Sequence, residues 1–111
     1  MRTQSRIGLA LSLGLALGFS ALMAADDGTA KSDKGKGVFA AQKCSMCHAI
    51  AGQGNKKTPL DGVGGRLSAD DIKKWIVSPK QMKADSKMRP YPSIPHEDLE
   101  ALVAYLSSLK K

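Results

Sequence analysis

The chain has 111 residues, of which 42% are hydrophobic and 24% are charged, and its formal net charge is +7. This length allows one small domain, and such a domain usually needs a cofactor, a metal or a disulfide to complete its core. The basic balance suits acidic protein partners or anionic lipid, whereas the scattered lysines, which are not interleaved with aromatics, argue against nucleic acid.

Residues 1–25 resemble an export signal. Arg2 and Arg6 form a basic start, and the stretch from Ile7 to Ala25 is apolar or small, which is typical of a secretory signal cleaved before Asp26. Removal of this segment would lower the net charge by two. The same apolar stretch would span about 28 Å as a helix, close to a bilayer core, so an uncleaved membrane anchor is the alternative.

Residues 26–33 are polar and show no hydrophobic period, so a flexible N-terminus is expected there. A first helix is predicted from Lys34 to about Lys43, because Gly35, Val38 and Phe39 follow the spacing of one helix face. Glycine within a helix costs about 1 kcal/mol relative to alanine, so Gly35 suggests that another segment packs closely there. A solvated Gly-Lys-Gly turn is the alternative.

The most informative stretch is Cys44-Ser45-Met46-Cys47-His48, which has the C-x-x-C-H pattern of c-type haem attachment. Two thiols can add to the two vinyl groups of a haem, and the imidazole that follows can supply the proximal iron ligand. Three other kinds of site share part of this pattern. A disulfide oxidoreductase needs a βαβ context, a zinc site needs further ligands, and a structural disulfide does not need the histidine.

Residues 49–66 contain no long apolar run and are expected to form a loop without strands, wrapping one edge of the haem. A second helix is predicted to start at Ser68, which can act as its N-cap, and to end before Pro79, with Ile72 and Ile76 on its apolar face. A final helix is predicted over 97–109, where leucine and valine form one stripe. Pro95 stands at the cap position, so a side-chain cap is missing unless Ser93 serves.

Taken together, these motifs resemble the small monohaem cytochromes c of class I over residues 34–109. The features that carry the resemblance are the haem motif, Gly35 with Phe39, Thr58-Pro59-Leu60, the run from Leu60 to Leu67, Trp75-Ile76-Val77-Ser78-Pro79, Lys87-Met88-Arg89-Pro90-Tyr91-Pro92 and the final Ala104-Tyr105-Leu106. The resemblance implies an all-α fold with about three main helices wrapped around one covalently attached haem, in a domain over residues 34–111. It also implies that Gly35 lies where the first and last helices cross, with Phe39 and Tyr105 filling the crossing.

The resemblance further suggests roles for individual residues around the haem. The Pro59 carbonyl would accept a hydrogen bond from the His48 ring, although Thr58 stands where the family commonly has glycine. Trp75 would cover the haem with its indole N–H near a propionate, or serve as an ordinary core residue. Met88 would be the sixth iron ligand, with Met82 and His96 as the alternatives; Arg89 stands where the family often has proline.

These expectations predict a periplasmic one-electron carrier rather than an enzyme. Covalent haem attachment occurs on the export side of the membrane in the resembling family, and the two propionates would lower the net charge by a further two. Lysines around the exposed haem edge would steer docking to acidic patches on a membrane oxidase or reductase: Lys43, Lys56, Lys57, Lys80, Lys83 and Lys87. The alternatives are an electron-entry subunit tethered by its leader, or a ligand sensor or peroxidase with an open sixth position. A monomer is expected.

Overall fold

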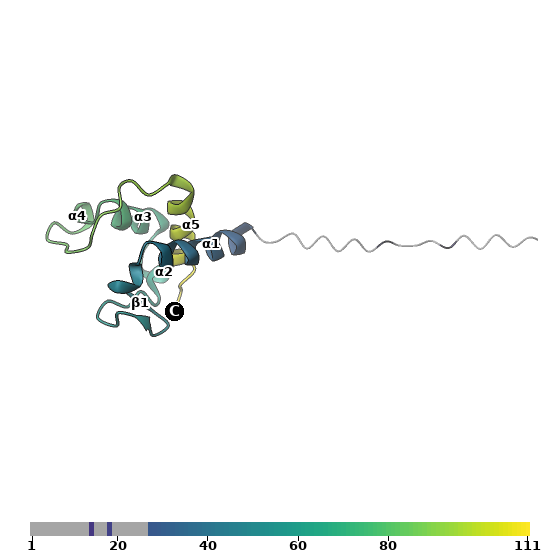
Figure 1. The fold of residues 1–111 in the computed structure, drawn as a ribbon, viewed down its shortest axis with the longest axis horizontal. Coiled ribbons are helices and arrows are strands. Elements are labelled where there is room, and N and C mark those ends of the chain that lie inside the picture. Colours follow the sequence, from purple (N-terminus) through teal and green to yellow (C-terminus); the bar gives the residue numbers. More distant parts are fainter. Residues whose placement is uncertain (1–13, 15–17, 19–26) are drawn as a thin grey trace, which may run out of the picture.

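Three main helices form the framework of the computed structural model, which describes residues 27–111 together with Gly14 and Gly18 (Figure 1). These are α1 (Asp27–Ala41), α3 (Ala69–Val77) and α5 (His96–Ser107). The prediction of an all-α fold with three main helices is confirmed. Apart from the two glycines, the predicted export signal over 1–25 lies outside the described residues. Among the described helices, none combines the length and the apolar character needed to cross a membrane.

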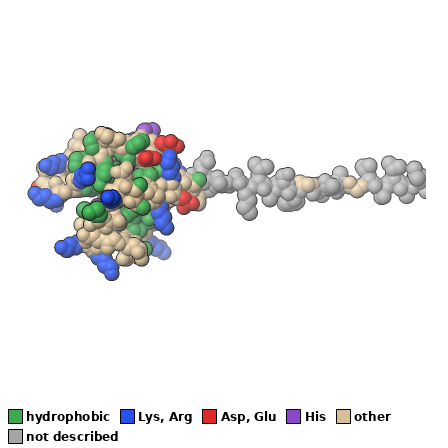
Figure 2. Space-filling model, in the orientation of Figure 1, with side chains coloured by type: hydrophobic (Ala, Val, Ile, Leu, Met, Phe, Trp, Pro, Cys, Tyr) green, Lys and Arg blue, Asp and Glu red, His purple; other side chains and the backbone are tan. Residues whose placement is uncertain are grey.

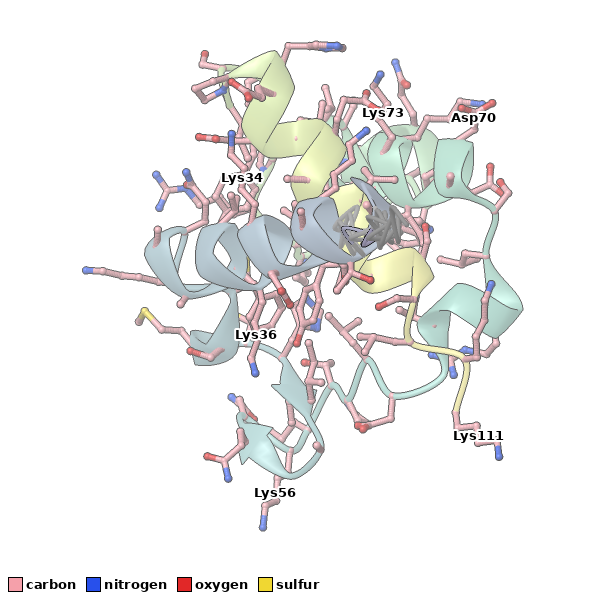
Figure 3. The ribbon with its side chains drawn as sticks, turned by 90° about the vertical axis from the view of Figure 1, so that its right-hand side faces the viewer. Lys34, Lys36, Lys56, Asp70, Lys73 and Lys111 are labelled. Atoms are coloured by element: carbon pink, nitrogen blue, oxygen red, sulfur yellow. The ribbon has the colours of Figure 1, made fainter. Side chains whose placement is uncertain are left out.

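Helices α1 and α5 cross, with Lys34 and Lys36 of α1 on either side of residue 35 (Figure 3). Gly35 lies at the crossing, as predicted. A Cβ atom added at this glycine would lie 1.9 Å from the Ala101 carbonyl oxygen and 2.6 Å from the Tyr105 Cβ, so only glycine allows the two backbones to approach this closely. Beside the crossing, the rings of Phe39 and Tyr105 pack edge to face, with their centroids 6.0 Å apart. The contact between α1 and α5 is therefore the structural centre of the domain.

The N-terminal end of α1 corrects one expectation. Residues 27–33 are helical rather than flexible, so α1 starts before the predicted Lys34 and ends at Ala41. This part of the chain is in contact with α5 and the residue after it, since the Lys34 ammonium is 3.2 Å from a Glu97 carboxylate oxygen and 3.6 Å from one of Asp98. The Ser32 hydroxyl also reaches Ser108 at 3.5 Å. These contacts join distant parts of the chain, which hydrophobic periodicity does not reveal.

Helix α3 starts and packs as predicted. The Ser68 hydroxyl accepts a hydrogen bond from the Asp71 N–H at 3.2 Å, and Ile72 and Ile76 are buried. Helix α3 ends before Pro79, but this proline then becomes the first residue of a short helix, α4 (Pro79–Met82). On α5, Leu99, Leu102, Val103 and Leu106 are buried as the stripe predicted. Pro95 is the N-cap residue, and the start of the helix has no side-chain cap.

The segment between the haem motif and α3 is more ordered than expected. A short antiparallel hairpin pairs β1 (Ala49–Ile50) with β2 (Gln53–Gly54), through a turn in which Ala51 and Gly52 both have positive φ. The expectation that this segment contains no strands is therefore wrong. A one-turn helix, α2 (Val63–Arg66), follows and lies against the end of α5, where the Gly64 N–H donates to the Leu109 carbonyl at 2.8 Å.

Candidate cofactor site

A cavity of about 380 Å³ opens into the core, and mostly apolar side chains line it. Figure 1 shows the haem-motif segment and β1 on one side of the α1–α5 pair and α3 and α4 on the other, and side chains from both sides reach the cavity. The functional side chains on its wall come from all along the chain: Cys44, His48, Arg66, Trp75, Met88 and Tyr91.

The haem motif begins in a single 3-10 turn, η1 (Cys44–Met46), and its last residues follow directly. Lys43 has a left-handed backbone, with φ at 58°, which turns the chain sharply out of α1. The turn is closed by the Cys47 N–H, which donates to the Cys44 carbonyl at 3.1 Å, and the His48 N–H donates to the same carbonyl at 2.9 Å. Cys44 and His48 line the cavity, whereas Cys47 is exposed. Burial raises the pKa of the Cys44 thiol, so this sulfur is protonated when unmodified at neutral pH.

The ring orientation of His48 is set by a backbone carbonyl, but the acceptor differs from the expectation. Nδ1 of His48 lies 3.1 Å from the carbonyl oxygen of Thr58. The expected acceptor was the carbonyl oxygen of Pro59. With its proton on Nδ1, the neutral imidazole keeps the lone pair of Nε2 free for a metal. The expectation that the Pro59 carbonyl orients the His48 ring is therefore wrong. The Thr58 carbonyl takes this role.

Backbone pairing explains why Thr58 rather than Pro59 takes this position. The Ala49 N–H donates to the Thr58 carbonyl at 3.2 Å, and the Leu60 N–H donates to the Ala49 carbonyl at 2.8 Å, which makes a short parallel bridge beside Pro59. The Thr58 hydroxyl also donates to the Cys47 carbonyl. Thr58 is thus fastened to the haem motif by its backbone and its side chain.

The three candidates for the sixth ligand lie in different places. Met88 is on the cavity wall, half-buried, and its N–H donates to the Ser86 hydroxyl at 3.2 Å. Met82 ends α4 and does not line the cavity. His96 is the exposed first residue of α5 and borders a separate surface hollow beside Lys34. Of the three, only Met88 shares the cavity with His48.

Two N–H donors also lie on the cavity wall. Trp75 is half-buried on α3, and Arg66 ends α2 with its guanidinium Nη1 2.8 Å from the Asp61 carbonyl oxygen. Asp61 is held in turn, because its carboxylate accepts the Ala51 N–H at 2.8 Å. Such donors are suited to carboxylate groups at the edge of a ligand.

Three residues of the wall that carry polar groups had no role at the site assigned from the sequence, namely Gln42, Arg66 and Tyr91. Arg66 and Tyr91 both belong to motifs that carried the resemblance, but without an assigned role. The position of Gln42 could have been inferred, because it lies three residues after Phe39 on the same face of the predicted helix and Phe39 also lines the cavity. Nothing in the sequence pattern alone shows that the end of α1 and the proline-rich segment meet at this wall.

These residues fit a c-type haem. The cavity gives a flat macrocycle an apolar surface within the core, one attachment sulfur and a histidine with a free Nε2 lie on its wall, and Arg66 and Trp75 offer donors to carboxylates. The fold and the site thus define a small helical haem protein.

The chain belongs to the cytochrome c family, since the family model described as cytochrome c matches residues 32–110. It carries a covalently attached haem of the c type. The chain is also 35% identical over 88 residues to cytochrome c oxidase subunit 2 of Alkalihalophilus pseudofirmus, and the match covers 71% of this chain and 26% of that protein. The chain therefore spans about a quarter of the length of this curated relative.

Proposed function

We propose that the protein is a periplasmic one-electron carrier in which His48 and Met88 are the two axial ligands of the haem iron. The observation that carries the ligand assignment is the presence of both side chains on one cavity wall, from which Met82 and His96 are absent. When bound, the haem supplies one iron that exchanges a single electron between the ferrous and ferric states.

His48 has the features of a firmly held ligand. The hydrogen bond from its Nδ1 to the Thr58 carbonyl fixes the orientation of the ring and leaves Nε2 to bind the iron. The carbonyl is itself held by the Ala49 N–H, so the acceptor that orients the ring is fixed by backbone pairing. This arrangement keeps the ligand geometry the same in both oxidation states, which favours rapid electron exchange.

Met88 has the features of a ligand that favours the reduced state. Its thioether is uncharged and polarisable, and thioether ligation raises the reduction potential of a haem. It lies in a segment whose backbone is restricted by Pro90 and Pro92, and Ser86 accepts its N–H. A restricted segment loses little entropy when the sulfur binds, which helps to retain a weak ligand.

Exposed lysines support docking to an acidic redox partner. Figure 2 shows blue side chains at the end of the molecule away from the start of α1, and red ones gathered where α1 meets the first turn of α5. The six lysines proposed for docking are all exposed: Lys43, Lys56, Lys57, Lys80, Lys83 and Lys87. Figure 3 shows Lys56 extending into solvent at the hairpin end. This uneven charge would orient the protein toward an acidic surface.

The ligand assignment is tested by replacing each methionine in the purified, haem-loaded protein. Met88→Ala should abolish the long-wavelength charge-transfer band between thioether and ferric iron and allow carbon monoxide to bind the ferrous form rapidly. Met82→Ala is the matched control and should leave both unchanged. Loss of the band in Met82→Ala, or its survival in Met88→Ala, would show that the assignment is wrong.

The docking role is tested through ionic strength. The rate of electron transfer to a membrane oxidase should fall as salt screens the lysines, with most of the loss between about 0.01 and 0.15 M. Replacing Lys80, Lys83 and Lys87 with glutamine should flatten this response. A rate that does not depend on salt in the unmodified protein would remove the docking claim.

The named relative supports a second candidate, an electron-entry component held in a membrane oxidase complex. That relative is an oxidase subunit, and the stretch similar to this chain is only about a quarter of it. The mass of the mature N-terminus distinguishes the two functions. A chain that starts at Asp26 with one haem mass added supports the free carrier, and a chain that retains residues 1–25 supports the tethered component.

A further inference from the structure

Tyr91 joins three parts of the site, although it is not one of the proposed iron ligands. It lies three residues after Met88, and its half-buried ring lines the cavity. Its N–H donates to the Ile76 carbonyl at 2.9 Å, and its hydroxyl lies 3.5 Å from the Gln42 carbonyl oxygen.

Both acceptors are carbonyls at helix ends. Ile76 is in the last turn of α3, and Gln42 directly follows α1, so neither carbonyl has the usual partner four residues further along the helix. Tyr91 therefore supplies donors that two separate helices lack. One residue ties the end of α1, which leads into Cys44, to the end of α3.

The neighbouring residues make Tyr91 the main point of attachment of this segment. Pro90 and Pro92 have no N–H to donate. Among the described residues from 88 to 94, only the Tyr91 N–H donates a backbone hydrogen bond to a helix or strand outside the segment. On its outer side, the Arg89 guanidinium lies 5.8 Å from the centre of the tyrosine ring. The ring is thus held between an exposed cation and the cavity.

We infer that Tyr91 is a positioning residue that retains the Met88 sulfur at the haem iron, by clamping the segment of Met88 to the ends of α1 and α3. This inference rests on the proposed ligation by Met88. Because the segment is attached at Tyr91, loosening the clamp raises the fraction of molecules in which the sulfur has left the iron. Part of this retention of the Met88 sulfur comes from the Tyr91 hydroxyl and its hydrogen bond to the Gln42 carbonyl, and the rest from the packing of the ring.

The test is a titration of the ferric, haem-loaded protein with free imidazole. Imidazole binds when the iron–sulfur bond breaks and an iron–nitrogen bond forms at the same position, with no change of oxidation state. Its apparent dissociation constant therefore reports how readily the Met88 segment opens. Tyr91→Phe removes the hydroxyl and keeps the ring, so it should lower this constant about threefold, because a hydrogen bond of 3.5 Å is long and therefore weak. Arg89→Gln should lower it about twofold, since exposed cation–π contacts are weak.

Tyr105→Phe is the matched control, because Tyr105 is the other tyrosine and lies at the α1–α5 crossing, away from the cavity wall. It should change the imidazole constant less than twofold. Equal constants for Tyr91→Phe and the unmodified protein would overturn the inference, as would equal shifts in both tyrosine variants. Far-ultraviolet circular dichroism of each variant confirms that it is folded.

A further variant separates this inference from the proposed function. Met88→Ala should bind imidazole far more tightly than the unmodified protein. If the two bind it equally, the ligation by Met88 is wrong. If Met88→Ala binds more tightly and Tyr91→Phe does not, the ligation stands and the positioning role of Tyr91 is overturned.

Discussion

Substitution of Gly35 by alanine tests the helix crossing on which the domain depends. The added Cβ would lie 1.9 Å from the Ala101 carbonyl oxygen and 2.6 Å from the Tyr105 Cβ. The carbonyl belongs to the backbone of α5, so it cannot rotate away. The two helices would have to separate by about 1 Å, which a close-packed core resists. Because Phe39 lies on the same helix and lines the cavity, this shift would also reach the haem.

The magnitude follows from two opposing effects. Alanine is favoured over glycine in a helix interior by about 1 kcal/mol. Overpacking of a core costs about 1–3 kcal/mol, and an overlap with fixed backbone belongs at the upper end. The expected net change for Gly35→Ala is a loss of about 2 kcal/mol from the free energy of unfolding. Gly37 is the matched control, since nothing lies within 4 Å of an added Cβ there. Gly37→Ala should therefore gain up to about 1 kcal/mol.

Both variants would be measured as haem-loaded protein by guanidinium unfolding, followed by circular dichroism and by haem absorption. The expected signs are opposite, although the two substitutions are chemically the same and lie on the same helix. A Gly35→Ala protein as stable as the unmodified one would show that α1 and α5 do not cross as closely as described. Destabilisation of the same size in both variants would point to the loss of glycine itself, not to the crossing.

Three further substitutions test local features of the fold. Ala51→Gly should raise the free energy of unfolding by about 0.5 kcal/mol in chemical denaturation, because φ is 50° at this position and glycine adopts it without strain; an unchanged or lower value would contradict the turn. Ser68→Ala should lower the free energy of unfolding by about 1 kcal/mol through loss of the α3 N-cap, and a neutral result would exclude the cap. Glu100→Gln tests pH dependence. The hydrogen bond from Lys73, 3.0 Å away, holds the pKa of the Glu100 carboxyl below its ordinary value of 4.5. Its stabilising effect is therefore present above that value and lost as the pH falls, so unfolding curves of Glu100→Gln and the unmodified protein should differ at pH 7 and converge in acid.

Local patterns predicted the elements that depend on neighbouring residues. The Ser68 cap acts over three residues, and the stripe of Leu99, Leu102 and Val103 lies on one helix face, so both were visible in the sequence and both are confirmed. For Gly35, the cost of a glycine within a helix indicated only that another segment packs closely there. That this segment is the last helix was implied by the resemblance to the family, because the contact joins residues far apart in the chain.

The misplaced acceptor of the His48 ring shows where such reasoning fails. The motif predicted a carbonyl partner, but a shift of one residue, from Pro59 to Thr58, depends on how the Ala49 backbone pairs across the loop. The same holds for α1. Its residues 27–33 show no hydrophobic period, and the Ser32 hydroxyl among them contacts Ser108, which is far away in the chain.

By itself, the sequence determined the chemistry of this protein: two thiols and an imidazole within five residues define the attachment of a haem, since spacing along a chain is local information. The tertiary structure decided which of two methionines shares the cavity with His48, and it brought Tyr91 to the ends of α1 and α3. These outcomes depend on packing between segments separated by tens of residues. Side chains in a close-packed core take positions that satisfy all their neighbours at once, so no single stretch of sequence specifies them.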